Sequence, residues 1–128
     1  MEVGAAGIAG DPAVDEAVIE QLATITDSEG FSVLGELLNA FLAATPVRLD
    51  ALDQALASRD LAVVADQAHA LTGSSASFGA RGMAALCRRL RTAAEHGDHD
   101  EAQLVMRHLH AEFLRVRARL VTLTRRGA

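Results

Sequence analysis

His69 carries the strongest chemical signal in the sequence. It lies in the stretch QAHALTGSSASFGA (residues 67–80), in which Gly73 follows one helical turn later and small residues continue. Imidazole titrates near neutral pH, and its neutral form offers a nitrogen lone pair that can attack as a nucleophile. Glycine in a helix interior costs about 1 kcal/mol relative to alanine. Gly73 therefore indicates that the space beside the imidazole is kept free of side chains. The alternative is that His69 is only a polar surface residue, as a lone exposed histidine often is.

The spacing of apolar residues predicts that this stretch belongs to a helix from residue 61 to about 78, with Asp60 as its N-cap. The side chains expected to face the core are Leu61, Val64, Ala65, Ala68, Leu71 and Ser75. At about 100° per residue, His69 lies about 110–120° from the centre of this stripe, on a face that it shares with Asp66 and Gly73. The imidazole should therefore be reachable from solvent.

Two helices are expected before this stretch. A short amphipathic helix is predicted to start at Asp11-Pro12 and to end at residues 27–30. Its apolar face would consist of Val14, Val18, Leu22 and Ile25. A long helix is expected from about residue 31 to 58, in which Pro46 predicts a kink, a break or a fresh start.

Two more helices are expected after it, from about residue 81 to 96 and from about residue 100 to 124, separated by Gly97 and Asp98. No strand pattern is found, and short connections make neighbouring helices antiparallel. The predicted fold is all-α, an antiparallel up-down four-helix bundle with a short additional N-terminal helix over one end. Residues 13–126 would form the bundle, and residues 1–12 a flexible tail.

Charge and composition narrow the range of functions. The net charge is −5, from twelve acids and two arginines in residues 1–66 and five acids and ten arginines in residues 67–128. The basic second half fits either an acidic partner or helices that pair by charge. Nucleic-acid binding is not expected of a chain that is acidic overall. No apolar run reaches the ~18 residues of a membrane span, and no secretory signal is recognised, so a cytoplasmic protein is expected.

The single cysteine, Cys87, allows no internal disulfide and is expected to be a small core residue. His108 and His110 are two residues apart and therefore point to different faces of the last helix. With one cysteine and no paired acid motif, no metal site is expected.

The stretch around His69 strongly resembles the signature of histidine phosphotransfer (HPt) domains. That signature typically reads Ala-His-x-Leu-Lys-Gly-Ser-Ser, followed by small residues and Gly-Ala. Further similarity lies in the segments LCRRL (residues 86–90) and EHGD (residues 95–98), and in residues 37–56 with Thr45-Pro46. The resemblance covers about residues 13–124, and the helix count from periodicity agrees with the bundle of that family.

By position, the resemblance implies that His69 is the phosphoacceptor and that Gly73 leaves room for the phosphoryl group. Asp66, which shares the face of His69, and Thr72 are expected in the surroundings of that group. It implies a monomeric phosphorelay intermediate of a bacterial two-component system, which carries phosphoryl groups between receiver-domain aspartates. The partners would be receiver domains of response regulators or a hybrid sensor histidine kinase, with neither nucleic acid nor membrane as a partner. No cofactor is implied, because the receiver supplies Mg²⁺. Without a nucleotide site, the chain would not be an enzyme by itself. It would be cytoplasmic, either free or as part of a membrane-bound hybrid kinase.

One residue departs from the family pattern, since Thr72 stands where these domains usually have lysine. A cation there would help to hold a phosphoryl group. Arg88 and Arg89 are expected near the level of His69 on the next helix, with Arg81 nearer the helix end. These three arginines could replace the missing charge or help to dock a partner.

Three alternatives remain. The departure at Thr72 allows a pseudo-HPt module that docks a receiver or kinase without being phosphorylated. The dimerisation bundle of a sensor kinase is disfavoured, because its histidine is typically followed by an acid and then a proline, whereas Ala70 follows here. A purely structural bundle leaves Gly73 unexplained.

Overall fold

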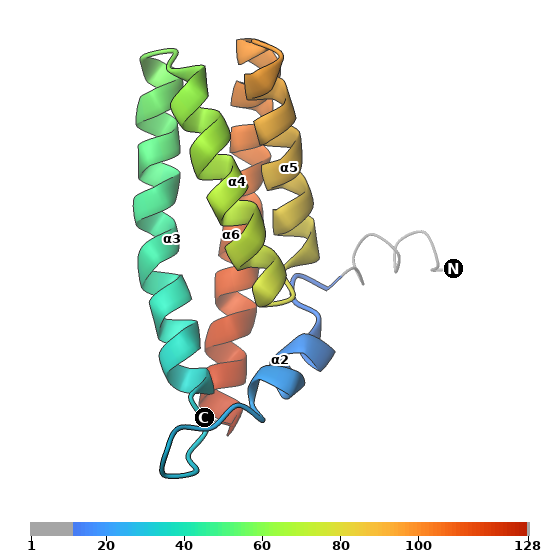
Figure 1. Ribbon diagram of the computed structural model, residues 1–128. Coiled ribbons are helices and arrows are strands. Elements are labelled where there is room, and N and C mark those ends of the chain that lie inside the picture. Colours follow the sequence, from blue (N-terminus) through green and yellow to red (C-terminus); the bar gives the residue numbers. More distant parts are fainter. Residues whose placement is uncertain (1–11, 128) are drawn as a thin grey trace, which may run out of the picture.

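The computed structural model describes residues 12–127, and within them every regular element is a helix. The helices are α2 (Glu16–Leu22), α3 (Leu34–Ala57), α4 (Leu61–Ser77), α5 (Arg81–Glu95) and α6 (His99–Gly127). The four long helices run alternately up and down and form a ring in the order α3, α4, α5, α6, while α2 lies across one end (Figure 1). The predicted four-helix bundle with a short N-terminal helix is confirmed.

The core of the bundle is built from the apolar stripes of all four long helices. Its fully buried side chains include Leu52 of α3, Leu71 of α4, Leu90 of α5 and Leu109 of α6. The heptad-like spacing along each helix keeps one stripe on the inside of an antiparallel bundle. None of the helices within the described residues combines the length and the apolar character that crossing a lipid bilayer requires.

The ends of α4 and α5 follow local signals in the sequence. Asp60 caps α4, where its carboxylate accepts a hydrogen bond from the backbone N–H of Val63 at 3.3 Å. Gly79 and Gly97 end α4 and α5 with φ of +73° and +71°, a region that favours glycine. These tight turns make α4, α5 and α6 consecutive antiparallel neighbours, as predicted.

The start of the N-terminal helix differs from the prediction. The helix begins at Glu16 rather than at Asp11-Pro12, and its cap is Asp15, whose carboxylate accepts from the N–H of Ala17 at 3.0 Å. The backbone N–H of Asp15 donates to the carbonyl of Gly79 at 2.8 Å, which holds the chain just before α2 in a non-helical conformation. Except for Pro12, the predicted tail of residues 1–12 lies outside the described residues, as does the expected cap Asp11.

Proline 46 does not break the long helix, so the prediction of a break or a fresh start there is wrong. Helix α3 runs without interruption from Leu34 to Ala57 (Figure 1). Pro46 lies on the exposed side of α3. Thr45 beside it is buried, and its hydroxyl donates a hydrogen bond to the carbonyl of Phe41 at 2.7 Å. Packing of the buried stripe against α4 and α6 outweighs the loss of one helical hydrogen bond.

Candidate functional site

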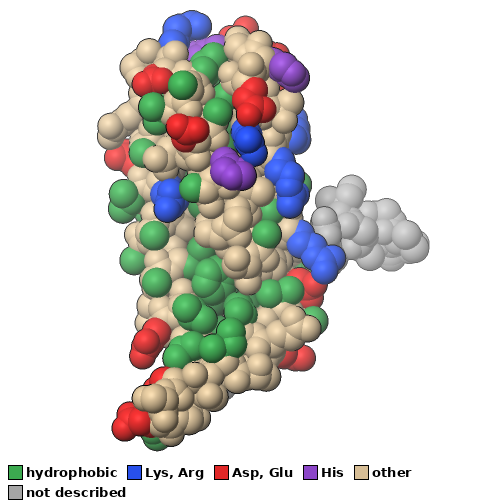
Figure 2. Space-filling view, in the orientation of Figure 1, with side chains coloured by type: hydrophobic (Ala, Val, Ile, Leu, Met, Phe, Trp, Pro, Cys, Tyr) green, Lys and Arg blue, Asp and Glu red, His purple; other side chains and the backbone are tan. Residues whose placement is uncertain are grey.

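His69 lies on the outer face of α4, near the middle of the bundle. The imidazole is exposed, while Val64, Ala68 and Leu71 of the same helix are fully buried. Figure 2 shows a histidine in the middle of this face, with arginine side chains close to it. The outward position predicted from the helical wheel is confirmed.

The imidazole borders a surface hollow of about 370 Å³ between α4 and α5. The side chains that line this His69 hollow are His69, Thr72, Arg88, Arg91, Thr92 and Glu95. Two come from α4 and four from α5, so the antiparallel packing of these neighbouring helices creates the site. The lining combines a nucleophilic ring, two guanidinium groups and a single carboxylate, which suits a small anionic group.

Arg91 makes the closest polar contact with the histidine. Its Nη1 lies 2.8 Å from Nδ1 of His69, and its Nε donates to the carboxylate of Glu95 at 3.0 Å. The guanidinium therefore bridges the ring on α4 and the carboxylate one turn further along α5. Arg91 was not among the residues singled out from the sequence.

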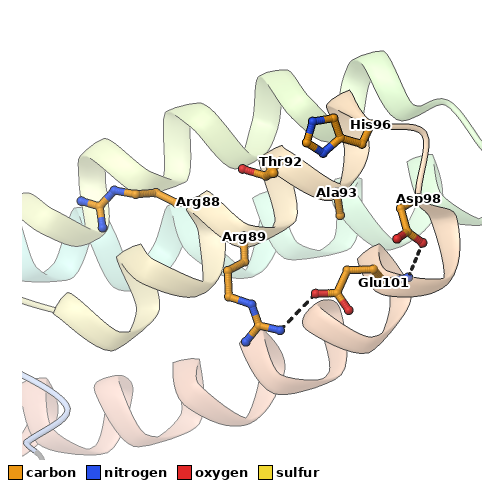
Figure 3. Close-up of a pocket in the computed structure, with 7 residues that line it drawn as sticks. All are labelled: Arg88, Arg89, Thr92, Ala93, His96, Asp98 and Glu101. Atoms are coloured by element: carbon orange, nitrogen blue, oxygen red, sulfur yellow. Dashed lines mark hydrogen bonds and ion pairs between the residues drawn. The ribbon is translucent and has the colours of Figure 1, made fainter.

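Arg88 and Arg89, both expected near the level of His69, leave α5 in different directions. Arg88 lines the His69 hollow, in agreement with the expectation. Arg89 instead donates to Glu101 of α6 at 3.1 Å, away from α4 (Figure 3). Adjacent residues on a helix point about 100° apart, so the two side chains cannot both face α4. Of these two arginines, only Arg88 lines the His69 hollow.

A second hollow, of about 310 Å³, lies on the other side of α5. Arg89, Ala93, His96, Asp98 and Glu101 line it, together with Arg88 and Thr92 (Figure 3). Arg88 and Thr92 border the His69 hollow as well, so these two side chains form the wall between the two depressions.

Arg81 lies at the start of α5, away from His69. Its guanidinium forms an ion pair with Asp15 at 2.6 Å and is 80% exposed. It therefore helps to attach the α2 segment to the bundle, and it does not line the His69 hollow.

Three residues of α4 were expected around the phosphoryl group. Thr72 lines the hollow, but its hydroxyl donates to the carbonyl of Ala68 at 2.8 Å, so its proton is already used within the helix. Gly73 is exposed, and a Cβ built on it would meet nothing within 4 Å. Asp66 is exposed one turn before His69 and lies outside the residues that line the hollow.

The space beside Gly73 shows that packing does not require a glycine at this position. Elsewhere a helix glycine often allows another backbone to approach, but here an alanine would fit without any contact. Glycine lowers helix stability here by about 1 kcal/mol relative to alanine, and packing does not compensate for this loss.

The single cysteine of the chain, Cys87, lies inside the bundle. Its side chain is fully buried, and burial raises the pKa of the thiol to about 12, against a smaller opposing effect of the Arg88 charge. A thiol with this pKa is almost fully protonated at neutral pH and is a poor nucleophile. Cys87 is a core residue, as predicted.

Two other histidines have structural partners. His99 donates from Nε2 to the carbonyl of Leu56 at 2.8 Å, and His110 lies 2.9 Å from the carboxylate of Asp53. Among the residues that the structure describes, no three histidine, cysteine or acidic side chains are grouped as a metal site would require.

Comparison with known proteins agrees with this fold. The model of the Hpt domain family matches residues 36–119, which include α4, α5 and the whole His69 hollow. The crystal structure of histidine-containing phosphotransfer protein B (HptB) from Pseudomonas aeruginosa PAO1 is similar to the chain, with a TM-score of 0.84 and 26% sequence identity. The similarity covers 92% of this chain and 99% of that chain. No curated protein sequence is similar enough to the chain to serve as a relative.

The chain belongs to the Hpt domain family, as the motif around His69 indicated. Members of this family are phosphotransfer intermediates rather than enzymes in the usual sense, and they interact with receiver domains. The chain is therefore a phosphotransfer protein of a phosphorelay.

Proposed function

We propose that His69 accepts a phosphoryl group from the aspartyl phosphate of one receiver domain and passes it to the aspartate of another. The observation that carries this proposal is the exposed imidazole on α4 with open space beside Gly73. An incoming phosphorylated aspartate needs access to one ring nitrogen and room for three phosphoryl oxygens, and this face of α4 offers both.

The reaction would be a direct displacement at phosphorus. The lone pair of a ring nitrogen of His69 attacks, an N–P bond forms, and the P–O bond to the aspartate breaks as the carboxylate leaves. The return step reverses these changes at the second receiver. The acyl phosphate already carries a good leaving group, so the step needs positioning and charge stabilisation rather than a nucleotide. In this proposal the Mg²⁺ belongs to the receiver, and the chain itself holds no cofactor.

The positive charge that the family usually provides by lysine would come from the neighbouring helix. Arg88 lines the hollow and forms no ion pair with another described residue, so its guanidinium is available for phosphoryl oxygens. Arg91 lies beside the ring itself. A guanidinium presents two parallel N–H donors to such an anion, which suits this task.

The proposal is tested by incubating the full chain with receiver domains that carry ³²P-labelled aspartyl phosphate. We expect the wild-type chain to take up an acid-labile label, as an N–P bond requires, and His69→Gln to take up none. His108→Gln is the matched control, because this histidine is exposed on α6, away from the hollow. Equal labelling of wild type and His69→Gln would overturn the assignment of the phosphoacceptor.

One observation favours a second candidate function, a module that docks a receiver or a kinase without being phosphorylated. The hydroxyl of Thr72 donates to Ala68, so this position gives the phosphoryl group neither a cation nor a free proton. Under this alternative, no receiver would label the wild-type chain, while binding measured by calorimetry would be the same for wild type and His69→Gln.

A further inference from the structure

The contact between Arg91 and His69 determines which ring nitrogen of the neutral imidazole carries the proton. A guanidinium has only hydrogen-bond donors, so Nδ1 of His69 must accept, with its lone pair directed at Nη1 of Arg91 across 2.8 Å. A neutral imidazole carries one proton, which this contact places on Nε2. The ion pair with Glu95 at 3.0 Å holds Arg91 in this orientation.

We propose that Arg91 is a positioning residue that places the ring proton of His69 and thereby controls both when the ring can attack and how long phosphohistidine lasts. This inference rests on the proposed function of His69 as phosphoacceptor. It concerns a residue for which the sequence pattern gave no role.

The first consequence applies to the unphosphorylated chain. With Nδ1 occupied by Arg91, Nε2 is the ring nitrogen that is left for a receiver, yet in this state it carries the proton and has no lone pair to donate. Attack requires Arg91 to leave Nδ1, so that Nδ1 takes a proton and Nε2 loses its own to solvent. An approaching phosphoryl group is anionic and attracts the guanidinium toward its oxygens, which releases Nδ1 at the moment when the lone pair on Nε2 is needed.

The second consequence applies after transfer. When Nε2 attacks phosphorus and the aspartate carboxylate leaves, the product is an imidazolium that carries its proton on Nδ1. Loss of this proton to water restores the Nδ1 lone pair, into which Arg91 can donate again. Hydrolysis and return transfer both proceed most easily when Nδ1 is protonated, because a neutral imidazole is then the leaving group. While Arg91 donates to Nδ1 across 2.8 Å, the lone pair of this nitrogen is occupied, so the contact should extend the lifetime of phosphohistidine.

Other charged side chains lie near the His69 ring on α3, α4 and α5. From α5, Arg88 adds a second positive charge to the hollow, and Glu95 partly offsets Arg91. On α4 itself, Asp66 lies one turn before the ring. From α3, Arg48 reaches α4 and donates to Gln67 at 3.3 Å. Among the residues that the structure describes, only Arg91 has a hydrogen-bonding contact with the ring, so its replacement should have the largest effect.

The first test reads the proton directly. ¹⁵N NMR of the full chain labelled in histidine distinguishes the two neutral tautomers by the ring nitrogen shifts. We expect the neutral His69 ring of the wild type to carry its proton on Nε2, and Arg91→Ala to give a mixture of tautomers. Arg91→Lys, whose ammonium also only donates, should restore part of the wild-type pattern. A wild-type ring with its proton on Nδ1, or an unchanged ring in Arg91→Ala, would overturn the inference.

The second test measures the lifetime of phosphohistidine without any receiver. The chain is phosphorylated with phosphoramidate, with His69→Gln as the blank for the other histidines, and loss of the label is followed against pH. In Arg91→Ala we expect the label to be lost about tenfold faster at a fixed pH, because one hydrogen bond from a charged donor to Nδ1 is removed. Arg89→Ala is the matched control, because that arginine forms a similar ion pair on the other side of α5. Identical pH profiles for wild type and Arg91→Ala would contradict the inference.

The two proposals fail in different ways. If no receiver labels the chain while both tests give the expected results, the relay function is wrong and the placement of the proton by Arg91 stands. If receivers label the wild type but not His69→Gln, and Arg91→Ala changes neither the tautomer nor the lifetime, the relay function stands and the role of Arg91 is wrong.

Discussion

Gly73 and Gly79 belong to the same short stretch of sequence, yet the structure accounts for the two glycines in different ways. At Gly79 the backbone has φ of +73°, and an added Cβ would lie 2.9 Å from the backbone oxygen of Asp15. At Gly73 the helix is regular, and an added Cβ would meet nothing within 4 Å. One glycine is required by the contact that attaches the α2 segment, and the other leaves a space that packing does not use.

The same contrast separates two regions of the molecule. At the α2 end, two ion pairs attach the α2 segment to the bundle, Arg81 with Asp15 and Arg119 with Glu16. In the His69 hollow, Arg88 has no ion-pair partner among the described residues. The charges that attach the α2 segment are therefore neutralised within the chain. In the hollow, Arg91 is paired with Glu95, whereas the charge of Arg88 remains available to a ligand.

The largest effect is expected at Gly79. Gly79→Ala should lower the free energy of unfolding by about 3 kcal/mol, because a left-handed conformation and a close backbone contact are both penalised. Gly97→Ala is the matched control, since Gly97 has nearly the same φ but open space around its Cβ, and it should cost about 1 kcal/mol. Urea unfolding of both variants measures the difference. Equal losses would show that the contact with Asp15 is unimportant.

The second effect is expected at Gly73 and concerns transfer rather than stability. Gly73→Leu should lower the rate of phosphoryl uptake from a receiver by about a hundredfold, because a side chain one turn from His69 displaces the incoming group. Its free energy of unfolding should be unchanged or raised by about 1 kcal/mol. Rapid-quench labelling and urea unfolding measure the two quantities. A variant that is less stable but transfers normally would reverse the assignment of this glycine.

A smaller effect is expected at Asp15, which both caps α2 and pairs with Arg81. Asp15→Ala removes both interactions and should cost about 1 kcal/mol of stability. Asp15→Asn keeps a capping oxygen and should cost about 0.5 kcal/mol, since the ion pair is exposed to solvent. Neither variant should change the rate of phosphoryl uptake, and a slower rate in either would link the two regions that we describe as separate.

The smallest effect is expected from restoring the family cation at Thr72. Thr72→Lys adds a charge to the lining of the His69 hollow and should raise the initial rate of phosphoryl uptake by about threefold, as an exposed ion pair allows. Thr72→Met is the control for length without charge and should leave this rate unchanged. The same rate in both variants would indicate that Arg88 and Arg91 already provide all the positive charge that the site uses.

The parts of the structure that were predictable from sequence depend on local signals. Asp60 before an apolar stripe and Gly79 after it mark the two ends of α4, and the stripe itself places His69 outside. Each of these signals acts within one or two helical turns, so no knowledge of the tertiary structure is needed.

The start of α2 was not predictable in this way. Asp11-Pro12 has the residue types of a helix start, but the helix begins at Glu16. The backbone N–H of Asp15 donates to Gly79, a residue far along the chain, and no local pattern reveals such a contact.

Arg91 was missed for a different reason, since its signal was present in the sequence. Arg88 and Arg89 were chosen for their level along the bundle, although neighbours on a helix point in different directions. Arg88, Arg91 and Glu95 follow the spacing i, i+3, i+7 and therefore share one face of α5, the face that borders α4. Whether a side chain faces the neighbouring helix depends on the direction in which it leaves its own helix as well as on its level along the bundle.

The antiparallel pair of α4 and α5 also has a consequence for the order of folding. Every residue that lines the His69 hollow belongs to this one helical hairpin, whose two arms are joined by a tight turn at Gly79. Closing a short loop costs little chain entropy, whereas the contact between α3 and α6 joins segments far apart in the sequence. We expect the hairpin to form early, so that the site is assembled before the ring of helices closes around the core.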